Sequence, residues 1–556
     1  MSMQSVLAED HTQQGATREP CCDPARSETL SMSGSYSHRS WEISSVLDGV
    51  VSGGAEKGNR NTAIHAGEKS DAPIVPKKPP NKEQAQQLLW VNAAETVEGR
   101  GAAKGNAVES PACRTPSRES ALTGLESVRE TAKRDRRLKF TALLHHITPS
   151  LLVESFYDLN KTAAVGVDGV TWRDYENLLY ERAHELHREI HTGAYRAQAS
   201  RRTYILKADG KLRPLGIAAV EDKIVQQAVV KVLRAIYEED FLGFSYGFRR
   251  GRGQHDALDA VWMGMSTRPI GWILDADISA FFDTIDHDWM IKFLQHRIAD
   301  KRIVRLIKKW LKAGVIEDGK RIKAEQGTPQ GAVISPLLAN IYLHYVYDTW
   351  AHQWRKHHAR GDVIMVRYAD DSVIGFQHEE EAKQFLEAMR ERFAKFGLAL
   401  HPQKTRLIEF GRYAEQRRKK RGLGRPETFD FLGFTHCCSK TRQGGFKILR
   451  RTIKKRLRAT LAAIREKLKR KRHEPIGQVG AWLKRVIRGY FNYHAVPDNL
   501  KRLKGFRHAV CRAWFKQLRR RSQKDKMTWA RFERFAEQYL PCALRVHPYP
   551  PERFAS

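Results

Sequence analysis

Asp370 and Asp371 are the adjacent residues in this chain with the clearest capacity for chemistry. They stand between two apolar, β-rich runs, VIMVRY at 363–368 and SVIGF at 372–376, which is typical of a hairpin with the acids at its turn. Adjacent side chains on a regular strand point to opposite faces, so only the turn can bring both carboxylates to one place. A divalent cation such as Mg²⁺, which prefers oxygen ligands, would offset the repulsion between them. An isolated Asp-Asp pair also fits a solvated turn, so its meaning depends on a third carboxylate.

A second acidic stretch, GWILDADISAFFD at 271–283, supplies further carboxylates. Apolar residues at every second position from Trp272 form one face of a predicted strand, so Asp275 and Asp277 share the opposite face. Aspartate is unfavourable inside a strand, and two on one face are hard to explain as structure unless the strand is a solvated edge. The spacing alone does not decide which of these two acids would join Asp370 and Asp371.

The net charge indicates the class of partner. The 556 residues include 97 Lys and Arg against 63 Asp and Glu, a formal charge of +34. An excess of this size favours a polyanion, with nucleic acid ahead of an acidic membrane surface. The excess is also concentrated, because residues 440–526 hold 29 Lys and Arg but only four Asp and Glu.

Cysteine spacing and hydropathy exclude several other classes of protein. The seven cysteines form no CxxC pair, so the sequence predicts neither a zinc framework nor a disulfide scaffold. No apolar run reaches 18 residues, and the N-terminus lacks the apolar core of a signal peptide. We therefore expect an intracellular protein with no membrane partner.

The order of predicted elements indicates a mixed α+β fold. Residues 1–117 have little periodicity and are expected to be largely disordered. From 118 onwards, helices alternate with a hairpin at 201–217, the acidic strand and the Asp-Asp hairpin, which predicts an antiparallel sheet backed by helices on one face. From Ile448 onwards the pattern becomes all-α, with four amphipathic helices whose outer faces are basic.

Basic and glycine-rich loops between these elements are candidates for binding phosphates. Lys207 and Arg213 flank the turn of the first hairpin, where they fit either solvated turn charges or triphosphate ligands. The loop SYGFRRGRG adds three arginines, at 249, 250 and 252. The loop QGTPQG at 326–331 precedes a helix whose first N–H groups could face phosphates or bases.

In their order along the chain, these motifs resemble those of a group II intron-encoded reverse transcriptase/maturase of the bacterial type without a C-terminal HNH endonuclease domain. The resemblance runs from about Leu122 to about Phe554, and no single motif carries it. The motifs, with their positions, are DISAFFD (277–283), PQG (329–331), YADD (368–371), HPQKT (401–405), FLGF (431–434) and RGYFNYHAVPDN (488–499).

The resemblance implies a right-hand polymerase with a metal site. Its fingers and palm would occupy 118–440, a helical thumb or maturase domain 441–540, and a short tail 541–556. Two Mg²⁺ ions would be held by Asp277, Asp370 and Asp371, so the resemblance favours Asp277 over Asp275. Nucleotide binding would fall to Lys207, Arg213, Phe282, Gln330, Gly331 and Lys404. In that set Phe282 would exclude a ribose 2′-hydroxyl, although plain core packing also fits it, and Lys404 would protonate the leaving pyrophosphate.

The resemblance also assigns the binding of primer and RNA. The primer end would be held by Phe431, Leu432 and Gly433. The intron RNA would bind exposed cations of the helical domain, namely Lys454, Lys455, Arg458, Arg465, Lys484, Arg485 and Arg488.

The implied function is RNA-directed DNA polymerisation coupled to splicing and mobility of the intron. Its partners would be intron RNA, a DNA primer or target and dNTPs, in a bacterial cytoplasm or at the nucleoid, and a homodimer is compatible with the sequence. Two alternatives stay open. One is a maturase that only binds RNA, and the other is a reverse transcriptase recruited to defence or to diversity generation.

Overall fold

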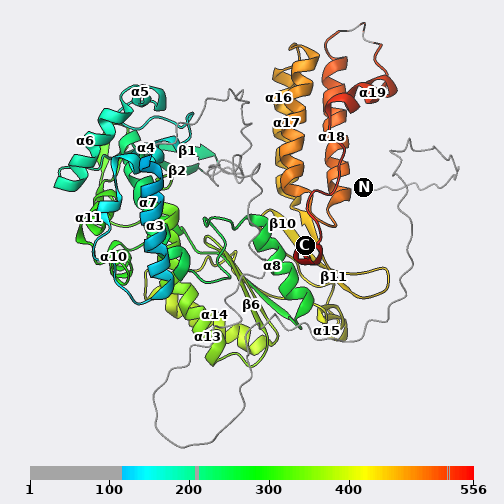
Figure 1. Ribbon diagram of the computed structural model, residues 1–556. Coiled ribbons are helices and arrows are strands. Elements are labelled where there is room, and N and C mark those ends of the chain that lie inside the picture. Colours follow the sequence, from blue (N-terminus) through cyan, green and yellow to red (C-terminus); the bar gives the residue numbers. More distant parts are fainter. Residues whose placement is uncertain (1–115, 207–211, 523, 525, 556) are drawn as a thin grey trace, which may run out of the picture. The chain divides into compact units, whose positions relative to one another are not determined.

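The computed structural model describes residues 116–206, 212–522, 524 and 526–555 (Figure 1), all within one compact unit that spans 70–556. The expected N-terminal extension lies outside the described residues up to position 115, and Lys207 lies outside them as well. Among the helices of the described part, none is long and apolar enough to cross a membrane.

Helices form the first part of the described chain. They are α3 (Pro116–Arg134), the 3₁₀ turn η1 (Leu144–His146), α4 (Pro149–Tyr157), α5 (Trp172–Glu176), α6 (Leu179–Thr192), α7 (Val220–Asp240) and α8 (Gln254–Thr267). The Thr148-Pro149 pair starts α4, because the Thr148 side chain accepts a hydrogen bond from Leu151 N at 3.2 Å and proline fits the first helical turn. Buried α7 packs against both α3 and α4.

The first predicted hairpin is confirmed as β1 (Ser200–Leu206) and β2 (Leu212–Ile217). These strands belong to a four-stranded N-terminal sheet of order β2-β1-β4-β5, in which β4 (Val315–Glu317) lies parallel to β1 and pairs with β5 (Lys320–Ile322). The strands β2 and β5 form the two edges of this sheet. Strand β5 is short and exposed, and the first residues of β2 are exposed.

The two acidic stretches meet in a second, central sheet of order β6-β7-β3-β8, with every pair antiparallel. Its strands are β3 (Trp272–Ala276), β6 (Val363–Tyr368), β7 (Asp371–Phe376) and β8 (Arg406–Glu409). The Asp-Asp hairpin is confirmed, with Tyr368 paired to Asp371 and only Ala369 and Asp370 between the strands. The acidic strand β3 is not an edge strand, since β7 and β8 flank it.

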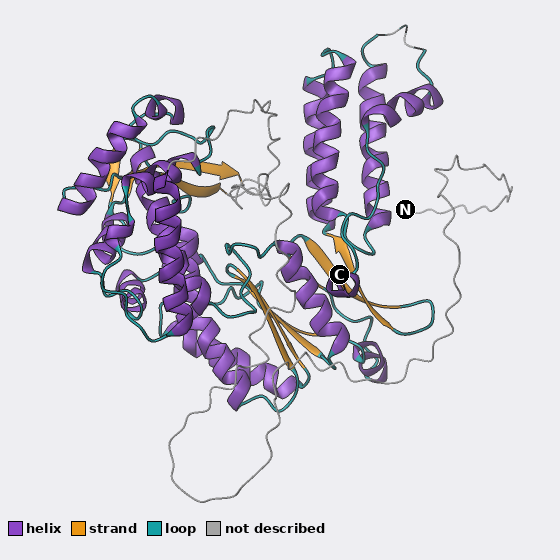
Figure 2. Ribbon diagram, viewed as in Figure 1, coloured by secondary structure: helices purple, strands orange, loops and turns teal. Residues whose placement is uncertain are grey.

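Side chains on the two faces of the central sheet enter two different cores. Leu274 and Ala276 join the large core that α14 (Glu379–Ala394) and the helices before it complete, as alternation predicts. Ile273 and Ile364 point the other way and are buried against α8, so a helix also covers part of the second face. Figure 2 shows the strands of this sheet in orange with helices around them. The remaining helical segments of this region are α9 (Phe281–Thr284), α10 (His287–Gln295), α11 (Lys301–Lys312), α12 (Ser335–Leu343), the π-helical turn η2 (His344–Asp348), α13 (Thr349–His357) and α15 (Ala414–Lys420).

A third sheet corrects the expectation that the chain is all-α from Ile448. Strand β11 (Phe446–Thr452) pairs along its whole length with β10 (Phe434–Lys440), and β9 (Phe429–Phe431) completes the sheet. Ile448 is fully buried in this sheet because it faces the core shared with α8. The helical pattern therefore begins at Lys454, six residues later than predicted.

The four predicted C-terminal helices are confirmed, and we call them the C-terminal helices. They are α16 (Lys454–Arg470), α17 (Ile476–His494), α18 (Leu500–Arg519) and α19 (Trp529–Tyr539), followed by α20 (Pro550–Ala555). The first three run side by side, drawn in orange to red in Figure 1, around a core of their own that includes Leu468, Leu483 and Trp514.

Candidate active site

The strand register brings Asp277 beside the Asp-Asp turn. In the antiparallel pair of β3 and β7, Asp275 lies opposite Val373 and Ala276 opposite Ser372. Strand β3 ends there, so Asp277 and Asp371 are the next residues along the two chains at this end of the sheet. The charge of Asp277 acts on both Asp370 and Asp371, which shows that the three acids lie near one another. The three predicted carboxylates are therefore contributed by neighbouring strands at one end of the central sheet.

The turn that carries Asp370 has an uncommon backbone conformation. Ala369 has φ of +56°, in the left-handed region that non-glycine residues rarely adopt. Such strain persists only where the surroundings hold it, and it is concentrated at functional sites. Here it lets a two-residue turn present Asp370 and Asp371 together, as the sequence pattern requires.

The HPQKT loop packs along Asp277. Its His401 N–H donates to the backbone carbonyl of Asp277 at 2.8 Å, and Lys404 Nζ lies 2.7 Å from Asp277 Oδ2. Thr405 Oγ1 donates to the same Asp277 carbonyl at 3.3 Å. The loop thus brings a cation to the carboxylate face, as expected for Lys404 if it acts at this site.

Burial and mutual repulsion raise the pKa values of both turn acids. Burial is the main cause at Asp370, and the charge of Asp277 adds to it, while Arg213 and Lys404 oppose it. The pKa of Asp371 rises to about 7. Desolvation by the surrounding protein is the main cause, and the negative charges of Asp370 and Asp277 add to it. Asp371 keeps a solvent-exposed surface although protein surrounds it on most sides, so a mobile cation can reach it.

Asp275 lies on the same face but has a different partner. Arg406 on β8 reaches within 3.7 Å of Asp275 Oδ2, and burial raises the pKa of this acid to about 6. Sequence reasoning missed Arg406, although its position directly after the HPQKT motif was the available signal. The pairing gives Asp275 a protein cation of its own, whereas neither Asp370 nor Asp371 forms an ion pair within the described residues.

The donor set at the end of the sheet suits a hard divalent cation. Three carboxylates from Asp277, Asp370 and Asp371 supply only oxygen atoms, and a protein ammonium, Lys404, already contacts one of them. Repulsion among them is the charge imbalance that a bound cation would relieve. Within the described residues, no three His, Cys, Asp or Glu side chains are gathered closely enough to surround an ion by themselves.

The PQG loop is held between α9 and strand β2. Thr328 N donates to Phe282 O at 2.8 Å, and Gly216 N of β2 donates to Gln330 O at 2.6 Å. Gly331 has φ of +105°, and a Cβ there would lie 3.0 Å from Gly216 O, so the close approach to β2 requires glycine. Gln330 and Gly331 are thereby placed beside the strand that carries exposed Arg213.

The Gln330 side chain is oriented by a residue that the sequence did not single out. Gln330 Nε2 donates to Asp283 Oδ1 at 2.9 Å, and Asp283 follows Phe282 directly in the chain. Phe282 itself is half-buried and meets Phe281 edge to face, with ring centroids 5.4 Å apart. Phe281 is the buried core residue, so Phe282 retains the partial exposure that a gate against nucleotides needs.

The FLGF motif forms a tight turn against the C-terminal helices. Leu432 and Gly433 both have positive φ, +45° and +85°, between β9 and β10. Tyr493 of α17 donates through its hydroxyl to Leu432 O at 2.7 Å, and Ile453 N donates to Gly433 O at 3.2 Å. Phe431 is buried in the core shared with α8. The turn therefore links the central region to α16 and α17.

The predicted RNA-binding cations lie on exposed surfaces of α16 and α17. On α16 the spacing of Lys454, Arg458 and Arg465 returns to one side of the helix, and Lys484 and Arg488 do the same on α17. None of the seven forms an ion pair with an acid in the described part of the chain, and all are exposed. In contrast, Lys469 on α16 pairs with Glu466 at 3.0 Å.

Two findings depart from the sequence-based expectations for arginines. Arg249, a candidate for binding phosphate, is instead buried and donates to Glu238, Leu242 O and Ser245 O. It is occupied because the end of α7 offers acceptors that the isolated loop does not reveal. Arg367, which sequence reasoning did not consider, is buried beside the Asp-Asp turn. The signal was one arginine within the apolar strand VIMVRY.

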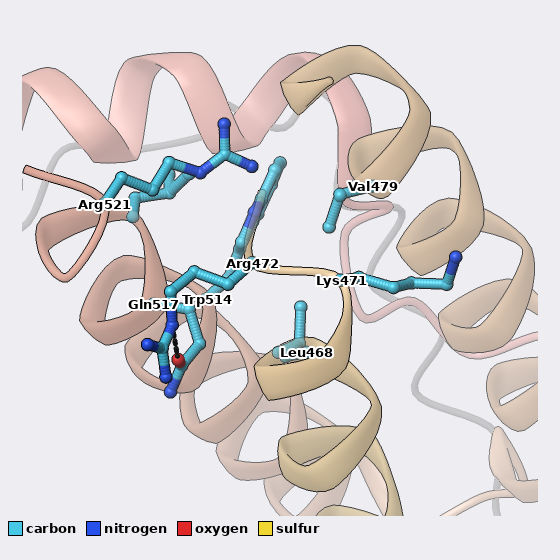
Figure 3. Close-up of a pocket in the computed structure, with 8 residues that line it drawn as sticks. Leu468, Lys471, Arg472, Val479, Trp514, Gln517 and Arg521 are labelled. Atoms are coloured by element: carbon cyan, nitrogen blue, oxygen red, sulfur yellow. Dashed lines mark hydrogen bonds between the residues drawn. The ribbon is translucent and has the colours of Figure 1, made fainter. Parts of the chain in front are cut away.

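A pocket among the C-terminal helices is separate from these residues. Figure 3 shows its lining side chains, with Arg472 Nε donating to Gln517 Oε1 at 3.1 Å and Trp514 at its wall. All of them come from α16, α17, α18 and the segments that follow α16 and α18. No residue predicted from sequence to bind nucleotide, primer or RNA lines this pocket.

Comparison with known proteins identifies relatives of this arrangement. Residues 205–436 match the family described as reverse transcriptase (RNA-dependent DNA polymerase). The chain is 37% identical over 278 residues to protein YkfC of Escherichia coli strain K12, a match that covers 44% of this chain and 72% of YkfC. It is 31% identical over 307 residues to the group II intron-encoded protein LtrA of Lactococcus lactis subsp. cremoris, covering 52% of this chain and 50% of LtrA.

A shorter match has a higher identity than these two. The chain is 44% identical over 144 residues to a 91 kDa protein encoded in the cob intron of Schizosaccharomyces pombe, covering 26% of this chain and 18% of that protein. The chain thus spans about half of LtrA and a smaller part of the yeast protein. The family match at residues 205–436 includes Asp277, Asp370 and Asp371.

Proposed function

The chain belongs to the family of group II intron-encoded reverse transcriptases and maturases, and on that basis we propose that it is an RNA-directed DNA polymerase that also binds its intron RNA. The observation that supports the polymerase proposal is the pairing of β3 with β7 up to Ala276 and Ser372, after which Asp277 follows at the same end of the sheet as the Asp370-Asp371 turn, with its charge acting on both turn acids. Binding of RNA alone would not require three carboxylates at the end of this sheet.

In this proposal Asp277, Asp370 and Asp371 hold two Mg²⁺ ions. When bound, such ions lower the pKa of a primer 3′-hydroxyl and neutralise the triphosphate and the departing pyrophosphate. Reverse transcriptases as a family use divalent cations, and the all-oxygen donor set here agrees with Mg²⁺.

The chain's own residues position the reactants. Arg213 and Lys207 bind the triphosphate, Gln330 and Gly331 line the pocket of the templating nucleotide, and Phe282 excludes a 2′-hydroxyl. Lys404, next to Asp277, gives a proton to the leaving pyrophosphate. The turn at 431–433 holds the end of the primer, while α16 and α17, as a thumb, hold RNA. Binding to intron RNA promotes splicing, and copying of that RNA at a DNA target in a bacterial nucleoid gives mobility.

Primer extension on poly(rA)/oligo(dT) tests the polymerase proposal. Asp370→Ala should reduce dTTP incorporation by at least about 10³-fold, because a metal ligand is lost, while Asp288→Ala, at an exposed acid on α10, serves as the matched control and should extend normally. Equal incorporation by wild type and Asp370→Ala would refute the assignment of the metal site. Inactive wild type with tight RNA binding would favour a maturase without polymerase activity.

Salt-dependent binding of intron RNA tests the maturase proposal. Each phosphate contact contributes about 0.7 to the slope of log K against log salt. Removing three exposed cations in Lys454→Ala/Arg458→Ala/Arg465→Ala should therefore lower this slope by about 2. Lys469→Ala/Arg470→Ala on the same helix removes cations that pair with Glu466 and should change the slope less. An unchanged slope in the triple variant would contradict RNA binding by this face.

A further inference from the structure

Arg367 occupies a buried position directly beneath the Asp-Asp turn. Arg367 is only 1% exposed, and acceptors from four parts of the chain surround its guanidinium. Nη1 donates to the backbone carbonyl of Ala369 at 2.9 Å and to Asn340 Oδ1 at 3.0 Å. Nη2 donates to Ser245 Oγ at 2.7 Å. The group therefore ties the turn to segments far from it in sequence.

Asp348 completes the network as the charge partner of Arg367. The two side chains form a bidentate pair, Nε to Oδ1 at 2.7 Å and Nη2 to Oδ2 at 2.6 Å, with side-chain exposures of 1% and 0%. A fully buried ion pair usually contributes little net stability, because both charges must leave water. Its presence next to the proposed metal site therefore calls for another reason, and the contacts support one, which is to fix the geometry of the turn.

A π-helical turn aims Asp348 at Arg367. Asn340 lies on α12 and Asp348 ends η2, eight residues later. In a continuous α-helix, residues eight apart point about 80° away from each other around the axis. The wider π turn lowers the rotation per residue and brings the two side chains toward one side. Both then reach the same guanidinium.

The other side of the turn is held by the segment around Ser245. Arg367 N donates to Phe244 O at 2.9 Å and Tyr246 N donates to Arg367 O at 2.8 Å, so this segment forms a single parallel bridge with β6. Gly247 then lies against the turn, where a Cβ would fall well inside van der Waals contact of the Ala369 backbone. Asn340 Nδ2 in turn donates to Gly247 O at 2.7 Å.

From these contacts we propose that Arg367, held by Asp348, is a positioning residue that fixes the left-handed turn and thereby the placement of Asp370 and Asp371. This inference rests on the proposed polymerase function, since it assigns the network a purpose in that reaction. Arg367 itself touches no substrate, and it acts through the carbonyl of Ala369. A displacement of about 1 Å at reacting groups can cost about 10²-fold in rate, so a loose turn should be costly.

The test compares two buried ion pairs. Asp348→Asn keeps the size of the side chain but removes the charge, and Asp240→Asn does the same at the Arg297–Asp240 pair, where Nε lies 2.9 Å from Oδ2 and side-chain exposures are 3% and 7%. The proposal predicts that kcat for primer extension falls at least ten times further in Asp348→Asn than in Asp240→Asn. The two variants are compared under conditions in which they have lost the same amount of melting temperature. KM for dNTP and affinity for intron RNA should be unchanged. Equal kcat in the two variants would overturn it.

A glycine variant tests the same turn from its other side and does not remove a buried charge. Gly247→Ala should displace Ala369 and lower kcat about tenfold or more, whereas Gly505→Ala in α18, where a new Cβ meets nothing within 4 Å, should not. Mn²⁺ titration without substrate gives a second readout, in which Asp348→Asn and Gly247→Ala should each weaken binding several-fold relative to their controls. Unchanged Mn²⁺ affinity in both variants would overturn the positioning role of Arg367, whether or not the wild type is active. An inactive wild type would count against the polymerase function and not against the positioning role.

Discussion

Lys404 Nζ lies 2.7 Å from Asp277 Oδ2, although 127 positions separate the two residues in the sequence. The contact joins the loop before β8 to the residue that follows β3, an inner strand of the sheet. Lys404 is largely exposed and long enough to leave this carboxylate, so it can hold the acid when no cation is bound and reach an incoming triphosphate when one is. The same lysine can therefore serve the empty and the loaded site.

This contact predicts the effect of removing the ammonium. Lys404→Ala should lower the rate of single-nucleotide incorporation about 10²-fold, because general acid catalysis at the leaving pyrophosphate is lost. Lys404→Arg keeps the positive charge but holds its proton too tightly, so we expect only partial recovery. Rapid-quench kinetics measures both rates. Lys395→Ala, at an exposed lysine directly after α14, should behave as wild type, and a normal rate in Lys404→Ala would contradict the role.

The partial exposure of Phe282 predicts how sugar selectivity is achieved. Phe282→Ala should raise incorporation of rNTP relative to dNTP about 10²-fold, since an opened apolar pocket no longer excludes one extra hydroxyl. The ratio of kcat/KM for CTP and dCTP on one template gives the measurement. If Phe282 is only core, the variant should lose stability while the ratio of the two nucleotides stays constant.

Two glycines of α17 give a matched pair for the packing of the C-terminal helices. A Cβ at buried Gly480 would overlap the ring of Tyr539 on α19, so Gly480→Ala should destabilise the protein by about 1–3 kcal/mol. Gly489 on the same helix has open space around it, and Gly489→Ala should stabilise by up to about 1 kcal/mol through helix propensity. Urea unfolding measures both. Shifts of the same sign would contradict the packing of α19 on α17.

His255 predicts a loss of stability in acid at the contact between α8 and α17. Its Nε2 lies 2.9 Å from Tyr493 O, its ring stacks on His547, and burial lowers its pKa to about 3. The unfolded imidazole takes up a proton below about pH 6.5, whereas the folded one does not until about pH 3. Stability from this group is therefore complete above pH 6.5 and is lost as the pH falls toward 3.

Urea unfolding at pH 7.5 and 5.5 checks this linkage. Wild type should lose about 1 kcal/mol more between the two values than His255→Gln, which cannot be protonated. The comparison with the variant removes the contribution of acids such as Asp222, whose pKa, raised to about 6 by burial, works in the opposite direction. Identical losses in the two proteins would show that His255 is not kept neutral by the fold.

Local patterns in the sequence were enough to predict the elements that carry the acids. Alternation identified β3, and two β-rich runs around Asp370 identified the hairpin, because each depends on residues within a few positions. The error at Ile448 arose because β11 is defined by its pairing with β10, and the helical spacing that begins at Ile453 was extended back over this strand.

Partners from distant segments could not be predicted in the same way. The role of Arg367 depends on Asp348, Ser245 and Asn340, which reach it from separate elements. The hydrogen bonds of Arg249 depend on the carbonyls of Leu242 and Ser245, in the segment that follows α7. In both cases the arginine's type was visible in the sequence, but its acceptors were set by packing.

The position of β3 between β7 and β8 also affects how the protein is made. Trp272 pairs with Phe376 on one side and Glu409 on the other, and both are synthesised more than a hundred residues later. At about 5–20 residues per second, β3 leaves the ribosome roughly 5 to 30 s before either neighbour is available. A bare apolar strand is prone to pair with other chains, and charged side chains along it discourage this. Asp275 and Asp277 would therefore discourage aggregation of nascent chains through β3 before the sheet is complete.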